Sequence, residues 1–149
     1  MLLASAICSC SEKQPETTEP MITKTEIQVE NGHFTPEIMH RLGKVGDVQV
    51  SPNHAKILYG VTYTSIEQNK GNRELYLMNV DGSENVKITN TPKSESNARW
   101  INDSQIIYMR SGKLYTATIE GSTLKNETEV ASAEGMESFE LSPAGDKLM

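Results

Sequence analysis

The residue types that most often carry enzyme chemistry are few in this chain and do not form a recognisable constellation. Its three histidines are His33 beside an expected turn, His40 on an expected helix and His54 in another turn. No serine stands in the Gly-x-Ser-x-Gly sequence that exposes a nucleophile at a strand-to-helix elbow. The serines fall in expected turns and loops instead. We therefore expect surface or packing roles for the histidines and no catalytic residue in this chain.

The sequence also lacks the patterns that hold metals and cofactors. Its two cysteines and three histidines do not have the spacing of a zinc site. Residues 81–85, Asp-Gly-Ser-Glu-Asn, offer oxygen ligands without the regularly spaced acidic positions of a calcium loop, so a hairpin turn is the better interpretation. Glycine loops that cradle phosphate are absent as well. We expect no metal and no cofactor.

The first thirty residues indicate a targeting signal followed by a tether. Residues 1–10 are a short apolar stretch ending Ile-Cys-Ser-Cys, similar to a truncated bacterial secretory signal with a lipoprotein cleavage site. On this interpretation Cys10 is the lipid anchor and the protein belongs to the bacterial cell envelope, in the periplasm or as an outer-membrane lipoprotein. The alternative is an ordinary buried N-terminus with two idle thiols. Residues 11–30 are expected to form a disordered acidic linker and a lead-in strand with Ile27 and Val29 on one face.

Composition and charge narrow the class of partner. The formal net charge is −6 and the isoelectric point is about 5.1. Lysine and arginine do not cluster, so nucleic acid is not expected as a partner. No apolar run reaches the roughly 20 residues that a membrane-spanning helix needs. Any contact with a membrane would therefore come from the lipid.

One short helix is expected within residues 31–45. Thr35 can cap its N-terminus, Pro36 suits the first helical position and Gly43 can close its C-terminus. An apolar stripe on this helix is expected to pack on the sheet that follows, and it consists of Ile38, Met39 and Leu42.

Residues 46–92 have the pattern of a four-stranded antiparallel meander. Short alternating or apolar runs are separated by turn residues, as in consecutive β-hairpins. The expected strands are centred on residues 48–50, 57–63, 75–80 and 86–89, with turns at 51–54 and 81–82 and a polar loop over 65–73.

This meander recurs along the chain. The sequence from Leu75-Tyr76 to the Asp-Gly-Ser turn is echoed 39 residues later, from Leu114-Tyr115 to Glu-Gly-Ser. The strand end at Val50 returns at Trp100, which we expect to fill space between repeats, and again at Leu141. A four-stranded unit with a period of roughly 40 to 50 residues is typical of a propeller blade.

The fold class is therefore predicted to be all-β, as an incomplete β-propeller. Blade one would cover residues 46–92, blade two 93–135, and the truncated start of blade three 136–149. Closed propellers need roughly four to eight blades, so we expect the chain to be a fragment of a longer protein.

Several segments together resemble a known family. The order Thr-Pro-Glu, then Val-Gly-Asp-Val-Gln-Val-Ser-Pro, then Asn-Lys-Gly-Asn-Arg-Glu-Leu-Tyr is similar to the N-terminal part of the propeller in bacterial prolyl oligopeptidase-family serine peptidases. The dipeptidyl- and acylaminoacyl-peptidase branch resembles it most, over residues 34–149. The Leu-Tyr and Asp-Gly pieces also occur in TolB-like propellers, whereas residues 35–43 and 69–73 are more particular to the peptidases.

The resemblance implies a parent enzyme that hydrolyses oligopeptides. Its Ser-His-Asp triad would lie on a C-terminal α/β-hydrolase domain, and the propeller would restrict access to short, unfolded peptides. This chain would supply part of the propeller and be inactive alone. Two alternatives stay open: a non-enzymatic, TolB-like envelope propeller that binds protein partners, and a lipid-anchored repeat protein with a scaffolding role.

Overall fold

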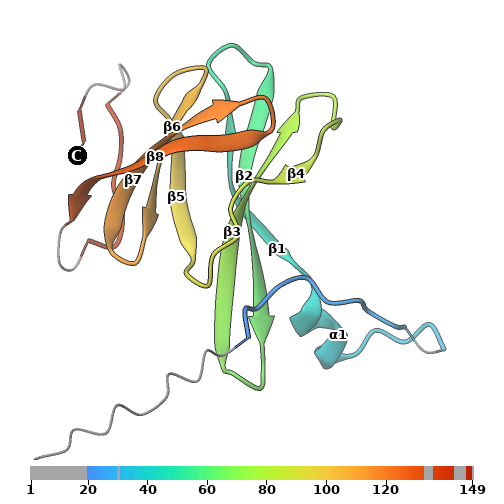
Figure 1. Cartoon of the computed structure of the whole chain (residues 1–149). Helices are drawn as coiled ribbons and strands as arrows, with labels where there is room; N and C mark the ends of the chain where they lie inside the picture. The colour runs from blue at the N-terminus through green and yellow to red at the C-terminus, as the bar shows by residue number, and fades with distance from the viewer. Residues whose placement is uncertain (1–19, 30, 133–135, 143–146, 149) are drawn as a thin grey trace, which may run out of the picture.

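The computed structural model of the chain describes residues 20–29, 31–132, 136–142 and 147–148. These residues form two four-stranded sheets and one short helix, so the predicted all-β class with a single short helix is confirmed. Neighbouring strands are antiparallel throughout, in the orders β1-β2-β3-β4 and β5-β6-β7-β8. The elements are α1 (Pro36–Arg41), β1 (Lys44–Val50), β2 (Lys56–Ser65), β3 (Lys70–Asn79), β4 (Val86–Lys87), β5 (Glu95–Trp100), β6 (Gln105–Arg110), β7 (Lys113–Glu120) and β8 (Thr123–Ser132). We call β1–β4 the first sheet and β5–β8 the second sheet. They lie side by side, with α1 next to the first sheet and away from the second (Figure 1).

The two sheets share one register. Tyr59 pairs with Tyr76 across β2 and β3, and Tyr108 pairs with Tyr115 across β6 and β7. The rings stack in both pairs, with centroids 5.5 Å apart in the first sheet and 6.0 Å in the second. Each sheet also has a bulge in its first strand, between Gly46 and Gln49 and between Ser96 and Arg99. The repeat expected from the sequence is therefore present in the backbone pairing itself.

The hydrogen bonds between Ser51 and Lys56 at the end of β1 recur between Ser142 and Lys147 after the second sheet. In the first sheet, the Ser51 amide donates to the Lys56 carbonyl at 2.8 Å, and the Lys56 amide donates to Ser51 Oγ at 2.9 Å. The Ser142 amide donates to the Lys147 carbonyl at 2.9 Å, and the Lys147 amide donates to Ser142 Oγ at 3.2 Å. An isolated antiparallel bridge joins Leu141 to Leu148 beside it.

The core lies between the two sheets. Leucines of the first sheet pack there against the aromatic and aliphatic face of the second, where Trp100 is 9 % exposed. The prediction that Trp100 fills space between the repeats is confirmed. The cluster comprises Leu58, Leu75, Leu77, Ala98, Trp100, Ile106, Tyr108, Ala117 and Ile119. A second cluster on the opposite face of the second sheet joins Ile107, Met109 and Leu114 to Phe139.

The prediction of a polar loop over residues 65–73 is wrong. β2 continues to Ser65 and β3 begins at Lys70, so only a turn of residues 66–69 separates them. Polar side chains in this extended hairpin have partners elsewhere in the chain. Arg73 lies 2.7 Å from the Asp47 carboxylate, and the Asn72 amide donates to the Thr91 carbonyl at 2.9 Å. These contacts between distant residues stabilise a strand that the local polarity argued against.

The helix begins as predicted and ends differently. Thr35 is its N-cap, with Oγ1 accepting from the Ile38 amide at 3.4 Å, and Pro36 follows at the first position. Gly43 does not close it, because Leu42 caps the C-terminus with extended backbone angles. Gly43 instead lets the chain approach β2, since a Cβ there would lie 2.7 Å from Val61 Cγ1. The expected apolar stripe is mostly exposed, at 54 % for Met39 and 43 % for Leu42.

The lead-in strand expected before the helix does not form. The described residues 20–29 have no regular secondary structure, and the first of them lie against the extended β2–β3 hairpin. The Gln68 side-chain amide donates to the Pro20 carbonyl at 3.1 Å, and the Asn72 amide donates to the Ile22 carbonyl at 3.5 Å. Side-chain contacts therefore take the place of strand pairing.

Candidate functional site

The most concentrated polar chemistry lies where the chain passes from the first sheet to the second. The connection over residues 88–94 runs beside β3 and leads into β5. It meets two carboxyl side chains, Glu74 of β3, which is 3 % exposed, and Glu95 of β5, which is 0 % exposed. Buried carboxyl groups are costly unless they are bonded, protonated or paired. We call Glu74, Glu95 and their partners Thr89, Thr91 and Arg110 the junction cluster.

Glu74 is surrounded by hydrogen-bond donors. Its Oε2 accepts from Thr89 Oγ1 at 2.6 Å. Its Oε1 accepts from the Thr91 amide at 3.1 Å and from the Asn72 side-chain amide at 3.3 Å. Hydrogen-bond donors therefore lie against both oxygens of the Glu74 side chain.

Glu95 has a poorer set of partners. Its Oε1 lies 2.7 Å from Thr91 Oγ1 and 3.7 Å from Arg110. Its Oε2 is buried and has no hydrogen-bond partner among the described residues. Burial raises the pKa of Glu95 to about 7, and the nearby Glu74 carboxylate adds to the rise.

Arg110 is committed mainly to another carboxylate. It donates to both oxygens of Glu127 on β8, at 2.5 and 3.1 Å, and its guanidinium lies 4.2 Å from the centre of the Tyr115 ring. The buried Tyr108 hydroxyl donates to the same carboxylate. Burial opposes ionisation of Glu127, but the bonds from Arg110 and Tyr108 hold its pKa below the usual value. Arg110 and Glu127 therefore form a bidentate ion pair that links β6 to the outer strand.

An open groove of about 400 Å³ lies over this pair. Its walls are the connection between the sheets and one end of β8, and its lining is Ile88, Thr89, Asn90, Thr91, Arg110, Leu124, Lys125, Asn126 and Glu127. Hydroxyl, amide and guanidinium groups here can hold a polar ligand by hydrogen bonds. The lining contains no cysteine, serine or histidine that could act as nucleophile or base. Groups of this kind suit the binding of a polar ligand.

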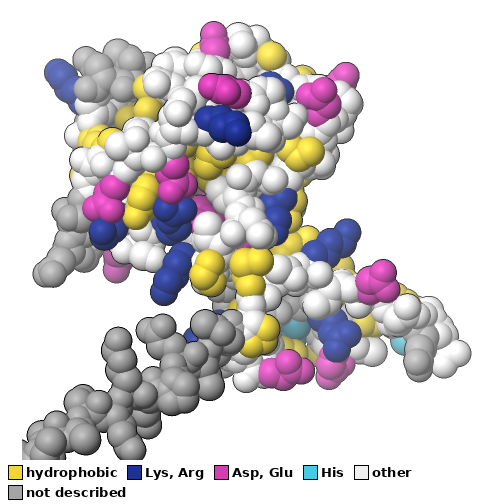
Figure 2. All heavy atoms as spheres, viewed as in Figure 1, with side chains coloured by type: hydrophobic (Ala, Val, Ile, Leu, Met, Phe, Trp, Pro, Cys, Tyr) yellow, Lys and Arg dark blue, Asp and Glu magenta, His cyan; other side chains and the backbone are white. Residues whose placement is uncertain are grey.

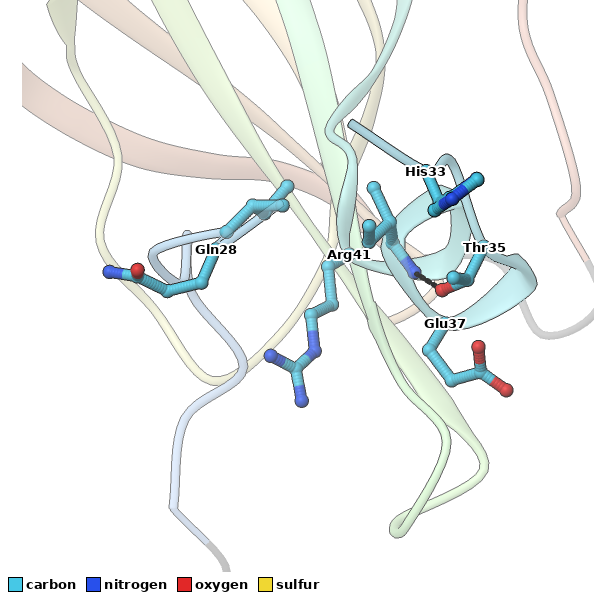
Figure 3. Close-up of a pocket in the computed structure, with 7 residues that line it drawn as sticks. Gln28, His33, Thr35, Glu37 and Arg41 are labelled. Carbon is cyan, nitrogen blue, oxygen red and sulfur yellow. Dashed lines mark hydrogen bonds between the residues drawn. The ribbon is translucent and has the colours of Figure 1, made fainter. Parts of the chain in front are cut away.

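A second, smaller hollow of about 260 Å³ lies beside α1 (Figure 3). Seven residues of the N-terminal segment and the helix line it: Ile27, Gln28, His33, Thr35, Glu37, Ile38 and Arg41. In Figure 3 the polar ends of Gln28, Glu37 and Arg41 point in different directions. A hydrogen bond from its own backbone and one with Thr35 lower the pKa of Glu37. Because the side chains diverge, this hollow does not assemble a site.

The residues considered from the sequence are not brought together. His33, His40 and His54 are all exposed and lie in separate segments. Among the described residues, no group of three or more histidine, cysteine or acidic side chains is placed to hold a metal ion. No helix in the described ranges has the length and apolar character to cross a membrane. Cys10, the expected lipid anchor, lies outside the described residues.

Acidic and basic side chains are interspersed on the face shown in Figure 2. Blue and magenta groups lie beside one another there, and no broad basic area is seen on that face. Several charges of the described residues are paired, including Lys113 with Glu129 at 2.9 Å.

The junction cluster was missed at the sequence level, although a signal for it exists. When the repeats are aligned by strand register, Glu95 falls on Val45 and Arg110 falls on Val61. Val45 pairs with Val61 in the first sheet, and Glu95 pairs with Arg110 in the second. A paired replacement of two valines by an acid and a base indicates a polar contact between the two strands.

Comparison with known proteins connects this chain to peptidases. No family model matches it. It is 33 % identical over 81 residues to dipeptidyl-peptidase 5 of Porphyromonas gingivalis, a match that covers 54 % of this chain and 12 % of that protein. It is 30 % identical over 97 residues to dipeptidyl-peptidase 5 of Porphyromonas endodontalis, covering 65 % of this chain and 13 % of that protein. The chain thus spans about an eighth of the length of these relatives, and the similarity supports a relationship to dipeptidyl peptidases.

Proposed function

We propose that this chain forms two successive blades, and the start of a third, in the β-propeller of a serine peptidase of the prolyl oligopeptidase family. The parent enzyme would hydrolyse oligopeptides, and the propeller would restrict access to a catalytic α/β-hydrolase domain. The observation that carries the proposal is the shared register of the two sheets, in a chain related to dipeptidyl peptidases.

The packing of the sheets supports the propeller. The face of the first sheet that carries Leu58 and Leu75 covers Trp100 and Tyr108 of the second. On the second sheet, the equivalent face carries Ile107 and Leu114 and is covered in turn by the segment with Phe139. Face-to-face stacking of equivalent four-stranded sheets is the arrangement of propeller blades.

The chemistry of the chain fits a gating role and not a catalytic one. Hydrolysis by this family needs a nucleophilic serine, a histidine and an acid in hydrogen-bond contact. This sequence contains no Gly-x-Ser-x-Gly elbow, and its histidines lie apart. The peptide-cleaving groups would come from another part of the parent polypeptide, and peptides would be its substrates.

The test is to assay the natural polypeptide that contains this chain on fluorogenic dipeptidyl substrates. We expect it to release dipeptides and to carry a Gly-x-Ser-x-Gly elbow whose Ser→Ala variant is inactive. The 149-residue chain, as the matched control, should show no turnover. A natural polypeptide without such an elbow that binds envelope proteins and cleaves no peptide would overturn the proposal and favour the TolB-like alternative.

We also propose that the protein is held in the bacterial cell envelope by a lipid on Cys10. The support is the Ile-Cys-Ser-Cys sequence at residues 7–10. Metabolic labelling with a palmitate analogue should mark the wild-type protein and not a Cys10→Ala variant. Equal labelling of the two proteins would remove the proposal.

A further inference from the structure

Two buried carboxyl groups of the junction cluster meet at a single threonine. The Thr91 amide donates to Glu74 Oε1 at 3.1 Å, and Thr91 Oγ1 lies 2.7 Å from Glu95 Oε1. The exposed fractions of Glu74 and Glu95 are 3 and 0 %. Two neighbouring carboxyl groups that are shielded from water do not both ionise readily. The hydrogen-bond partners around Thr91 indicate which of them keeps its proton.

The bonds to Glu74 leave no place for a proton on it. Thr89 Oγ1 accepts from the Leu75 amide at 2.8 Å, so its own hydrogen is directed to Glu74 Oε2 at 2.6 Å. The other oxygen of Glu74 accepts from the Thr91 amide and the Asn72 side chain. All three partners are donors toward Glu74, which is therefore the ionised member of the pair.

The contacts of Thr91 are best satisfied when Glu95 carries a proton. Thr91 Oγ1 lies 2.6 Å from the Lys93 carbonyl oxygen and accepts from the Lys93 amide at 3.1 Å. A hydroxyl has one hydrogen, and a carbonyl oxygen can only accept, so that hydrogen is directed to Lys93. The contact of 2.7 Å with Glu95 Oε1 is then a hydrogen bond only if Glu95 is the donor.

We propose that Glu95 is protonated where the two sheets pack together, that it donates to Thr91 Oγ1, and that this bond makes the junction of the sheets a pH-sensitive joint.

The charged groups around Glu95 do not compensate an ionised carboxylate there. Glu74 faces it from β3 with a negative charge, and Arg110 of β6 is held by both oxygens of Glu127 of β8. The Tyr108 hydroxyl of β6 also donates to Glu127. Among the other charges on strands packed against β5, Asp47 of β1 is paired with Arg73 of β3, and Lys56 of β2 lies 4.0 Å from Glu84.

The pKa of Glu95 agrees with this assignment. Burial raises it to about 7, and a bond donated by Thr91 would lower it. Because the Thr91 hydrogen is directed to Lys93, Thr91 does not favour the ionised form of Glu95. Between the ordinary value of 4.5 and about 7, the folded chain then keeps a proton that the unfolded chain has released. The folded state is therefore favoured at the acidic end of this window, and its stability falls as the pH rises through it.

Loss of the proton acts on a defined element. It removes the donor that links β5 to Thr91 and places a second anion beside Glu74. Thr89 and Thr91 belong to the connection over residues 88–94, which forms one wall of the open groove. We therefore expect this connection to loosen from β5, and the groove to widen, as the pH rises above about 7.

The test compares the wild-type chain with Glu95→Gln and with Glu129→Gln as a matched control. Glutamine keeps the size of the side chain and donates permanently to Thr91, whereas Glu129 is a glutamate of an exposed ion pair with Lys113. Carbon-detected NMR of the glutamate carboxyl groups should show Glu95 titrating near pH 7. The unfolding constant in urea should rise on the order of 100-fold between about pH 5 and pH 8 in the wild type and the control. The rise should be largely absent in Glu95→Gln.

Two results would overturn the proposal. One is a Glu95 carboxyl signal that titrates below about pH 5, because the side chain would then be ionised in the packed junction. The other is a pH dependence of unfolding that is the same in Glu95→Gln and the wild type. The NMR titration needs only the wild-type protein, so it decides the assignment even if the variant folds poorly.

Discussion

The first strands of the two sheets have the same register and opposite surroundings. β1 and β5 carry the same bulge, and each has one residue at positive φ within it, Asp47 and Asn97. Three valines of β1 are exposed, with fractions of 64, 55 and 50 % at Val45, Val48 and Val50. The equivalent positions of β5 are buried, with fractions of 0, 1 and 9 % at Glu95, Ala98 and Trp100.

The difference comes from the neighbouring sheet and not from the strand itself. β5 packs against β1, β2 and β3, whereas no other sheet of the described residues packs on the matching face of β1. In a stacked repeat, each unit obtains its burial from the unit next to it. A side chain at the same backbone position therefore contributes very differently to the free energy of unfolding in the two sheets.

The largest expected effect comes from the tryptophan of β5. Trp100→Ala should lower the free energy of unfolding by about 3 to 5 kcal/mol, because it removes a large ring from the core between the sheets. Val50→Ala, at the equivalent position of β1, should cost under about 1 kcal/mol since half of that side chain is already in solvent. Urea unfolding of both variants measures the contrast. Equal losses would mean that the two faces are covered equally in solution.

Much of the fold could be predicted because its signals are local. The repeated Leu-Tyr pairs and the turns after them place β3 and β7 correctly, and Thr35 with Pro36 places the start of the helix. The extended β2–β3 hairpin could not be predicted in this way. Its polar residues are stabilised by distant partners, such as Asp47 for Arg73, and these are not visible in a window of neighbouring residues.

The junction cluster was harder to predict because burial of a charge depends on packing between sheets. Glu95 and Arg110 look like ordinary surface residues when their strands are taken singly. Only the alignment of the two copies, in which they replace the paired Val45 and Val61, indicates that they are cross-strand partners. Repeat register therefore carries information about the site that composition and motifs do not.

The second prediction replaces Glu95 with valine, the residue found at the equivalent position 45 of the first sheet. Glu95→Val replaces a buried acid with an apolar side chain of similar volume and leaves Arg110 bonded to Glu127. We expect a gain of about 2 kcal/mol at pH 8, where the ionised acid is costly, and little change at pH 5, where it is neutral. Urea unfolding at both pH values measures this. A large loss at both values would show that the bond to Thr91 outweighs the cost of burying the acid.

The third prediction concerns two positions at which the large residue and the small residue are reversed between the sheets. In the first sheet the Arg73 side chain covers Gly60. In the second sheet Gly112 is at the position equivalent to Arg73, and the buried Met109 is at the position equivalent to Gly60. A Cβ on Gly60 would lie 2.3 Å from Arg73 Nε, so the guanidinium would have to move away from Asp47, which is now 2.7 Å from it.

Gly60→Ala should therefore destabilise the fold, but only modestly. Displacing the arginine destabilises the folded state. Alanine also reduces the conformational entropy of the unfolded chain, which offsets part of that loss, so we expect a net decrease of about 1 kcal/mol in the free energy of unfolding. Gly46→Ala is the matched control, because its Cβ would lie 3.2 Å from the same guanidinium and need a smaller shift. In the background of Arg73→Ala the clash is absent, so Gly60→Ala should lose its cost there and the two changes should not be additive in urea unfolding. Additive losses would mean that Arg73 does not rest on Gly60, and that the contrast with Met109 has another cause.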